Sequence, residues 1–518
     1  MSSDSTTHSF YSILFRRPED CSDENRVQSS SIFRDLNLNQ VFESLAASKE
    51  EYGLTQYFLM PQSDLESITY RQAVIKDLEQ TQLRTHVMAF AQKMKEMREC
   101  LAQAEKLPYE LQKAGWFLDA VLIYCEAVLS LHDSLSSMQP ESLGFKAFRN
   151  YLRAYIDRKD FQLLTAEART IKKGLSEVTY LLHLKGKRVV VCKYGGEPDF
   201  GVEVEKTFER FRQGEVRSYL THFRDSVHMN HVEAAILERV ALIYPETFGK
   251  LLDFVENHRG FLDETIRQFD IEVQFYLAYL EFIERLRGAG LKFCYPHITR
   301  DSKEVYANET FDLALADKLV REGSRVVVND FYLKDKERIL VVSGPNSGGK
   351  TTFARMFGQL HYLARLGYPV PGGEARLFLY DHLFTHFERE EHIENLRGKL
   401  QDELIRFHEI LRMATENSIL IINEGFASTS LDDAVFLSKE IIKQVSAKGM
   451  LCVYVTFLDE LSSLNEATVS MVSMVDPNNP TIRTYKIVRR QADGLAYAIA
   501  IAAKYGLTYE SIRRRVAK

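Results

Sequence analysis

Residues 339–352 read Ile-Leu-Val-Val-Ser-Gly-Pro-Asn-Ser-Gly-Gly-Lys-Thr-Thr, which is a short apolar run followed by a glycine-rich loop and a helix-forming segment. The apolar run predicts a buried strand, and the loop meets the spacing GxxxxGK[ST]. Strand, loop and helix in this order are the context that a phosphate-binding loop requires. The stretch therefore predicts a domain that binds a nucleoside triphosphate.

Each residue type in this loop has a physical task. Glycines allow the backbone to curl, so that successive N–H groups and the positive end of the following helix face the phosphates. Lys350 is expected to reach the terminal phosphates, and the Thr351 hydroxyl is expected to bind Mg²⁺. The predicted nucleotide-binding residues of the loop are Gly344, Pro345, Asn346, Ser347, Gly348, Gly349, Lys350, Thr351 and Thr352.

A second apolar run, residues 418–422, ends in the polar pair Asn423 and Glu424. Its length fits a strand that is buried on both faces. In phosphate-loop enzymes an Asp at such a strand end helps to hold Mg²⁺, and in ABC-type members the next Glu handles the attacking water. We therefore expect Asn423, with Thr351, to be a weakened metal ligand and Glu424, with Lys350, to be catalytic.

Composition indicates a globular protein of several domains. The chain has 518 residues, of which 45% are hydrophobic, and a net charge of −6, so any nucleic-acid contact must come from a local patch. Six scattered cysteines without a CxxC pair are typical of reduced thiols. No apolar run is expected to approach the roughly 18 residues of a membrane span, so we expect a cytoplasmic protein with no membrane partner.

The chain divides, by pattern, into a flexible lead-in (1–34), a mainly helical region (35–324) and a C-terminal α/β region (325–518). After Pro245, apolar residues recur in steps of three and four and predict one helix of about 35 to 40 residues. A β-prone run with a turn, residues 185–196, interrupts the helices. It carries the basic residues Lys185, Lys187, Arg188 and Lys193.

The C-terminal third resembles the MutS family of DNA mismatch-repair and recombination ATPases. The loop with its unusual Pro345-Asn346 pair is similar to the family's phosphate loop, and Asn329 lies in a segment similar to its nucleotide-base segment. Further similar segments follow in order, and they are residues 381–385, 403–415, 428–433, 485–488, 491–494 and 497–499. The helical region fits the family's core and lever more loosely, through features such as residues 70–72.

The resemblance implies an ABC-type ATPase that works as a dimer, with ATP and Mg²⁺ bound at the loop. Gly398, Lys399 and Ser430 would reach the partner's nucleotide, because they lie at the family's signature and dimer-crossing positions. Only about 30 residues precede the helical region, so mismatch-reading and connector domains are not expected. The basic run would lie in a reduced clamp near residues 180–215 and contact DNA phosphates, although a solvated hairpin edge explains it equally well.

Three positions depart from the family pattern. Asn423 replaces an Asp, Phe457 replaces a His that contacts the γ-phosphate, and Gly398 replaces a Ser. These changes predict slow hydrolysis, unless a neighbour such as His386 or Lys399 compensates.

Two functions remain open at this point. The first is a dimeric, ATP-driven clamp on double-stranded or branched DNA in repair or recombination, most simply a homodimer. The alternative is a nucleotide-gated protein scaffold with weak ATPase activity and no intrinsic DNA binding.

Overall fold

The computed structural model describes residues 10–21, 30–47, 49–186, 188–197, 229–388, 398–476, 478–479, 482–492 and 513. Contacts divide the chain into two compact units. The first consists of Met1–Phe10, Thr81–Pro140 and Lys146–Asp270, and the second of Tyr11–Gln80, Glu141–Phe145 and Ile271–Lys518. The prediction of a multidomain protein, rich in helices and with an α/β part, is confirmed at this level.

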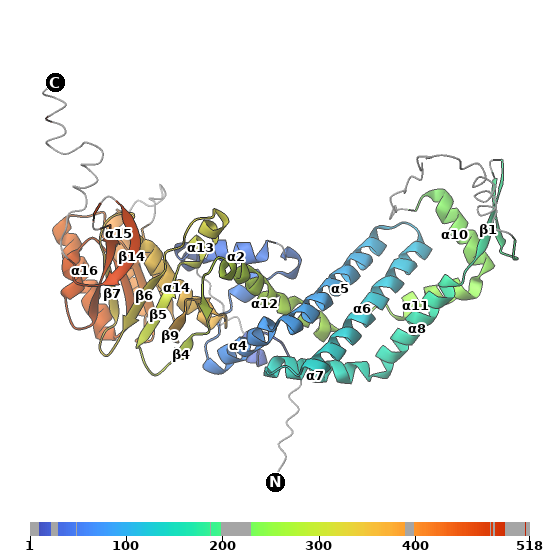
Figure 1. The fold of residues 1–518 in the computed structure, drawn as a ribbon, viewed down its shortest axis with the longest axis horizontal. Helices are drawn as coiled ribbons and strands as arrows, with labels where there is room; N and C mark the ends of the chain where they lie inside the picture. Colours follow the sequence, from blue (N-terminus) through green and yellow to red (C-terminus); the bar gives the residue numbers. More distant parts are fainter. Residues whose placement is uncertain are drawn as a thin grey trace, which may run out of the picture. The chain divides into compact units, whose positions relative to one another are not determined.

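Over the residues that the structure describes, the first unit is helical apart from one β-hairpin. The pair α5 and α6 lies side by side (Figure 1), and α5 buries Leu83, Val87, Phe90 and Met94 in steps of three and four. This spacing places one apolar stripe along the helix. The elements of the unit are α5 (Thr81–Lys106), α6 (Glu110–Met138), most of α7 (Leu143–Ile156), α8 (Lys159–Ser176), β1 (Tyr180–Lys185), β2 (Arg188–Lys193), α10 (His231–Ile243), α11 (Pro245–Asn257) and the start of α12 (Glu264–Gly288).

Helix α6 corrects the expectation that no apolar run reaches the length of a membrane span. By length and composition alone it is long and apolar enough to cross a membrane, and half of its most apolar window is buried inside the protein. The buried side chains include Leu118, Val121, Val128 and Leu131. A core helix that packs against a neighbour such as α5 has the same composition.

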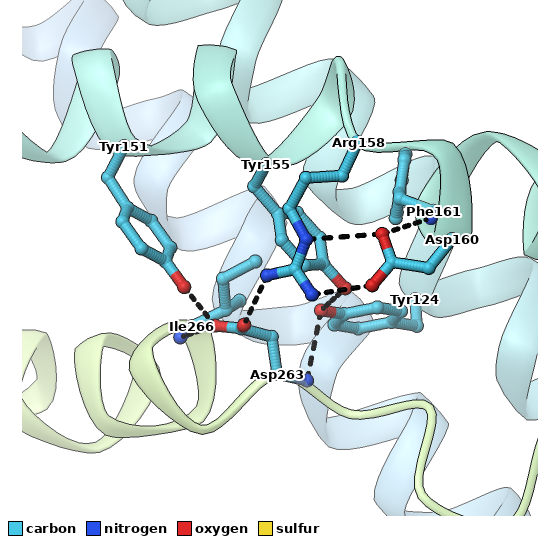
Figure 2. A network of polar contacts seen from close by, with 8 residues as sticks. All are labelled: Tyr124, Tyr151, Tyr155, Arg158, Asp160, Phe161, Asp263 and Ile266. Atoms are coloured by element: carbon cyan, nitrogen blue, oxygen red, sulfur yellow. Dashed lines mark hydrogen bonds and ion pairs between the residues drawn. The ribbon is translucent and has the colours of Figure 1, made fainter.

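The prediction of a single long helix after Pro245 is wrong, because the structure has two helices, α11 and α12, separated by residues 258–263. The Asp263 carboxylate accepts a hydrogen bond from the Ile266 N–H (3.1 Å) and so caps the start of α12. Figure 2 shows the hydroxyl of Tyr151 and the guanidinium of Arg158 pointing at the same carboxylate. The predicted apolar seam is nevertheless buried along α12, from Ile266 to Ile283.

The predicted β-prone interruption is confirmed in part, because β2 lies within residues 185–196 but pairs antiparallel with β1, which precedes that run. Lys185 is opposite Arg188 at the turn, where Gly186 has a φ of 61°, a conformation that favours glycine.

The second unit contains the α/β part. Its helices are η1 (Pro18–Cys21), α1 (Ser30–Asp35), α2 (Leu38–Ala46), η3 (Glu50–Tyr52), α3 (Thr55–Phe58), α4 (Leu65–Glu79), the rest of α12, α13 (Leu313–Arg321), α14 (Lys350–Arg365), α15 (Lys399–Met413), α16 (Leu431–Lys448) and η4 (Asp459–Ser463). Its strands are β3 (Phe293–Cys294), β4 (His297–Thr299), β5 (Val305–Thr310), β6 (Asn329–Leu333), β7 (Ile339–Ser343), β8 (Val370–Pro371), β9 (Glu374–Phe378), β10 (Leu383–Phe387), β11 (Ile419–Asn423), β12 (Leu451–Val455), β13 (Thr468–Val475) and β14 (Arg483–Arg489).

The main sheet has six strands in the order β10-β11-β12-β7-β13-β14. All neighbours are parallel except β13 and β14, which are antiparallel. Strands β7 and β12 are buried along their whole length. Near-continuous apolar strands of this kind are expected where helices cover both faces of a parallel sheet. The carboxyl ends of β7, β11 and β12 therefore lie at one edge of the sheet.

A second sheet, in the order β4-β9-β5-β6, crosses the predicted boundary at residue 325. Strands β4 and β5 precede that residue, whereas β6 and β9 follow it. The lead-in expected to be flexible also differs in part, because Ile13, Leu14 and Phe15 are buried and the Ser12 hydroxyl donates to Glu272 (2.7 Å). The division of the chain into functional domains after residues 34 and 324 stays a prediction. The closing helix expected beyond residue 493 lies outside the described residues.

Candidate nucleotide site

The glycine-rich loop, residues 344–349, joins the end of β7 to the start of α14. Gly344 and Gly349 have φ angles of 119° and 92°, which side chains rarely tolerate. At Gly348 a Cβ atom would lie 2.3 Å from the Ser473 hydroxyl, and that hydroxyl donates to the Gly348 carbonyl (2.7 Å). The glycines are therefore required by the backbone path and by the close approach of β13.

Lys350 is buried and lies against the loop that precedes it. Its Nζ donates to the carbonyl oxygens of Gly344 (2.9 Å) and Pro345 (3.1 Å) and lies 4.2 Å from the centre of the Phe457 ring. Burial lowers the pKa of this ammonium, and the carboxylate of Glu424 opposes the shift. The loop thus carries one ammonium group at the point where a phosphate chain would need a cation.

Thr351 and Asn423 bring the two predicted segments together. The Thr351 hydroxyl donates to the Asn423 side-chain oxygen Oδ1 (2.8 Å), which connects α14 to the end of β11. Glu424 follows directly, with a φ of 56°, and its backbone N–H donates to the Val455 carbonyl of β12 (3.0 Å). The pair predicted from sequence therefore lies at the same sheet edge as the phosphate loop.

The oxygen atoms at this edge fit a magnesium ion. Mg²⁺ prefers oxygen ligands and is commonly held by one or two protein groups together with substrate phosphates. The Thr351 hydroxyl and the Asn423 carbonyl are such groups, and Glu424 is next to them in the chain. Within the described ranges no group of three or more His, Cys, Asp or Glu side chains forms a metal cage of its own. The donor set suits an ion that arrives with a nucleotide.

Asn329 has a structural task in this fold. Its amide donates to the Tyr485 carbonyl (3.2 Å) and accepts from the Ile487 N–H (2.7 Å), so it joins β6 to β14. Gly349 lies close to Tyr485, because a Cβ atom at position 349 would be 3.8 Å from that tyrosine. A nucleotide contact by Asn329 stays a prediction, and both of its amide ends already bind β14.

The three residues predicted to reach a partner lie at the starts of two helices. Gly398 precedes α15, and Lys399 pairs with Glu388 (2.5 Å). Ser430 caps α16, since its hydroxyl accepts from the Asp433 N–H (3.3 Å). Their contact with a second chain stays a prediction.

Of the departures from the family pattern, Phe457 is half exposed beside Lys350. His386, considered as a compensating group, is buried on β10 and stacks on Phe407 with ring centroids 3.9 Å apart.

The basic residues of the hairpin are at its two ends. Lys185 and Arg188 face each other at the turn, and Lys193 is opposite Tyr180 at the other end. Like charges directly opposite each other on a sheet are unfavourable, so this arrangement favours a nearby anion. Lys187 and residues 198–215 lie outside the described residues.

Three residues that contact the site elements were missed from sequence. Ser473 lies against the loop, and Arg483 donates from Nε to the Asn346 carbonyl (3.1 Å). The Glu403 carboxylate accepts from the Phe426 N–H (3.1 Å), two residues after Glu424. Ser473 and Arg483 lie outside the similar segments, and Glu403, which begins the similar segment 403–415, gives no local signal of its contact with Phe426, because only the tertiary fold brings these residues to the site.

Comparison with known proteins identifies the C-terminal region. The family model for MutS domain V matches residues 340–517. A DNA mismatch repair protein MutS from Thermotoga neapolitana is 24% identical over 317 residues, which cover 59% of this chain and 37% of that protein. The MutS from Pseudothermotoga lettingae is 27% identical over 47% of this chain and 30% of its own length.

The MutS from Halalkalibacterium halodurans is 30% identical over 201 residues, 37% of this chain and 23% of that protein. The chain thus matches about a quarter to just over a third of the length of these curated relatives. The C-terminal region therefore matches a MutS domain V, and the matches that extend beyond it relate the chain to the MutS family over about half of its length.

Proposed function

We propose that this chain is a MutS-like ATPase that binds ATP with Mg²⁺ at the edge formed by β7, β11 and β12. The observation that carries the proposal is the Thr351–Asn423 hydrogen bond, because it joins the phosphate loop to the strand that ends in Glu424. An ABC-type P-loop fold is supported by the parallel strand order around β7. A helix that follows such a loop is suited to bind phosphates.

The roles at the site follow from chemistry. Lys350 and the loop 344–349 bind the phosphates, and Thr351 with Asn423 binds Mg²⁺, which would offset phosphate charge. Glu424 orients the attacking water and accepts its proton. Asn423 lacks the negative charge of an Asp, and Phe457 cannot donate a hydrogen bond, so hydrolysis is slow. Lys399 and Ser430 of a second copy complete the site in a homodimer.

On the DNA side, we propose that nucleotide binding sets the angle of the helical levers around double-stranded or branched DNA. The support is the paired Lys185 and Arg188 at the hairpin turn, where phosphate neutralisation would relieve their repulsion. The relatives are named for DNA mismatch repair. This chain would act in the cytoplasm on a repair or recombination intermediate.

The alternative function, a nucleotide-gated protein scaffold, is favoured by a different feature of the same hairpin. Leu184 is 77% exposed, and Leu182, Val189 and Val190 are also exposed. Apolar side chains on an open hairpin suit a protein partner better than a phosphate backbone.

A binding survey separates the two functions. Labelled duplex, branched and single-stranded DNA are titrated with the purified chain, with and without ATP, at several salt concentrations. The clamp predicts nucleotide-dependent binding that weakens steeply with salt. ATP binding without any DNA binding would contradict the clamp and favour the scaffold, and absence of ATP binding would contradict both.

A further inference from the structure

Glu403 is a buried acidic residue on α15 that contacts the turn after the candidate catalytic Glu424. Only 5% of its surface is exposed, and its Oε2 accepts a hydrogen bond from the Phe426 backbone N–H (3.1 Å). Burial raises the pKa of this carboxyl, and the Phe426 N–H opposes the shift. A buried carboxylate is costly unless it is hydrogen-bonded, so the side chain has a specific partner in this turn.

The turn that Glu403 contacts has an unfavourable backbone. Glu424 and Phe426 have φ angles of 56° and 62°, in the left-handed region that residues other than glycine rarely adopt. Gly425 between them is tightly surrounded, since a Cβ there would lie 3.2 Å from the Tyr454 hydroxyl. Strained conformations of this kind persist only where neighbouring groups hold them.

Two further contacts hold the same turn. The Glu424 N–H donates to the Val455 carbonyl (3.0 Å), which fixes one end to β12. The Phe426 ring stacks on Phe407 of α15, with centroids 5.0 Å apart. The turn is therefore fixed between β12 on one side and α15 on the other, and Glu403 supplies the polar contact on the α15 side.

The position of Glu403 on α15 connects this turn to the start of the helix. Lys399 lies four residues earlier, so the two side chains are neighbours on one helix face. Lys399 pairs with Glu388 (2.5 Å), and both charges act on the Glu403 carboxyl. An anion that binds at the start of α15 would change the electrostatic effect of Lys399 and Glu388 on the Glu403 carboxyl. This change would occur one helical turn before the residue that contacts Phe426.

We infer that Glu403 is a positioning residue for Glu424, because its carboxylate holds the left-handed turn of residues 424–426 and thereby connects the start of α15 to the water-handling carboxylate. The inference rests on the proposed ATPase function. It assigns Glu403 no contact with nucleotide or water, so its loss should change turnover and leave nucleotide affinity in place.

The test compares substitutions that differ in what they offer to the Phe426 N–H. Glu403→Gln keeps an acceptor oxygen at the same reach, Glu403→Asp keeps the charge with a shorter reach, and Glu403→Leu removes the acceptor. Glu409→Leu is the matched control, since Glu409 is an exposed acid on the same helix. ATP affinity, single-turnover hydrolysis and amide hydrogen exchange of the 424–430 segment are measured for each full-length protein.

We expect single-turnover hydrolysis to fall by about tenfold to hundredfold in Glu403→Leu and Glu403→Asp, the range for a misplaced catalytic group. ATP affinity should stay within about twofold of the wild-type value, a change well below about 1.4 kcal/mol in binding free energy. Amide hydrogen exchange in residues 424–430 should accelerate. Glu403→Gln should stay close to wild type, and so should Glu409→Leu. If Glu403→Leu does not fold, the Asp and Gln variants carry the same comparison.

Unchanged exchange in Glu403→Asp, or equal loss of hydrolysis in the Gln and Asp variants, would overturn the inference. A wild-type protein that binds ATP without hydrolysis would contradict the proposed turnover, and the exchange comparison would then decide on Glu403 alone. A wild-type protein that does not bind ATP would contradict the proposed function itself. The exchange comparison would still decide whether Glu403 holds the turn of residues 424–426.

Discussion

The Thr351 hydroxyl donates a hydrogen bond of 2.8 Å to the side-chain oxygen of Asn423, and so the first turn of α14 and the last residue of β11 share one polar contact. The two residues are 72 positions apart in the chain. An Asp at position 423 would offer the same oxygen with a full negative charge. At the proposed magnesium site, the amide would keep an oxygen ligand in place and lower the electrostatic attraction for the cation.

We predict that Asn423→Asp lowers the Mg²⁺ concentration needed for half-maximal ATP hydrolysis by about tenfold, which corresponds to about 1.4 kcal/mol. The added charge attracts the divalent cation directly. Titration of Mg²⁺ at saturating ATP measures the effect. Asn417→Asp is the matched control, because Asn417 is partly exposed and lies in the turn two residues before β11. An unchanged Mg²⁺ requirement in Asn423→Asp would remove position 423 from the metal site.

We predict that Lys350→Ala weakens ATP binding by about a hundredfold, since a charge-assisted hydrogen bond contributes about 1.5 to 3 kcal/mol and Lys350 is the cation proposed for the phosphates. Equilibrium binding of a fluorescent ATP analogue measures the loss. Lys336→Ala removes an exposed lysine whose surface pair is with Glu466, and it should bind ATP normally. Near-normal affinity in a folded Lys350→Ala protein would contradict the assigned role.

We predict that Glu424→Gln keeps ATP binding and lowers single-turnover hydrolysis by about a hundredfold, the range for loss of a positioned base. Glutamine preserves size and hydrogen bonding but cannot accept the proton from water. Glu416→Gln, an exposed acid before β11, serves as the control. Equal hydrolysis rates in the two variants would show that another group handles the water.

Much of this site could be predicted because its chemistry is concentrated in two short segments. Gly344, Gly349, Lys350 and Thr351 have a spacing that already specifies the turn and the helix, and the run that ends at Asn423 has the length of a buried strand. The contacts with Ser473 and Glu403 could not be predicted in the same way. They bridge positions 125 and 23 residues apart, and only the packing of β13 and α15 brings them together.

The long helix after Pro245 shows the opposite case. Apolar residues recur in steps of three and four from Leu262, and no proline stands between Pro245 and Pro296, so the pattern alone predicts one continuous helix. After the break, the Asp263 carboxylate caps α12 and accepts a hydrogen bond from Tyr151 (2.8 Å), a contact that no local pattern predicts. The sheet that includes strands on both sides of residue 325 could not be predicted for a related reason, since the pairing of β5 with β6 and β9 is not local in sequence.

His361 on α14 gives the protein a pH dependence that can be measured without ligand. The imidazole is buried, its Nδ1 faces the Phe357 carbonyl (2.9 Å), and burial lowers its pKa to about 4. In the unfolded chain the pKa is about 6.5, so the unfolded state binds more protons between these values. The contribution of His361 is fully present above pH 6.5 and is lost as the pH falls towards 4.

We predict that the free energy of unfolding of the wild type falls by about 3 kcal/mol more than that of His361→Phe between pH 6.5 and 4, because each pKa unit corresponds to 1.36 kcal/mol. Denaturant unfolding at several pH values measures the difference, and other titrating groups cancel in the comparison. His132→Phe, in the first unit, tests for a general effect of removing a histidine. Parallel pH profiles of wild type and His361→Phe would show that this imidazole is not held neutral.

The last prediction concerns the hairpin and DNA. If Lys185, Lys187, Arg188 and Lys193 bind phosphates, their replacement by Ser should weaken DNA binding and flatten the slope of log affinity against log salt by up to about 0.9 per lost contact. ATP binding should not change, because these residues belong to the first unit and the phosphate loop belongs to the second.

The control for the hairpin variant removes the same number of charges from the same unit, by replacing the exposed Lys95, Lys106, Lys113 and Lys146 with Gln. It separates a specific contact from a change in net charge. A salt slope that changes equally in both quadruple variants would indicate only a general electrostatic effect. A slope that changes in neither variant would contradict the clamp at this hairpin and favour the scaffold, for which the exposed Leu182 and Leu184 would then be the residues to replace.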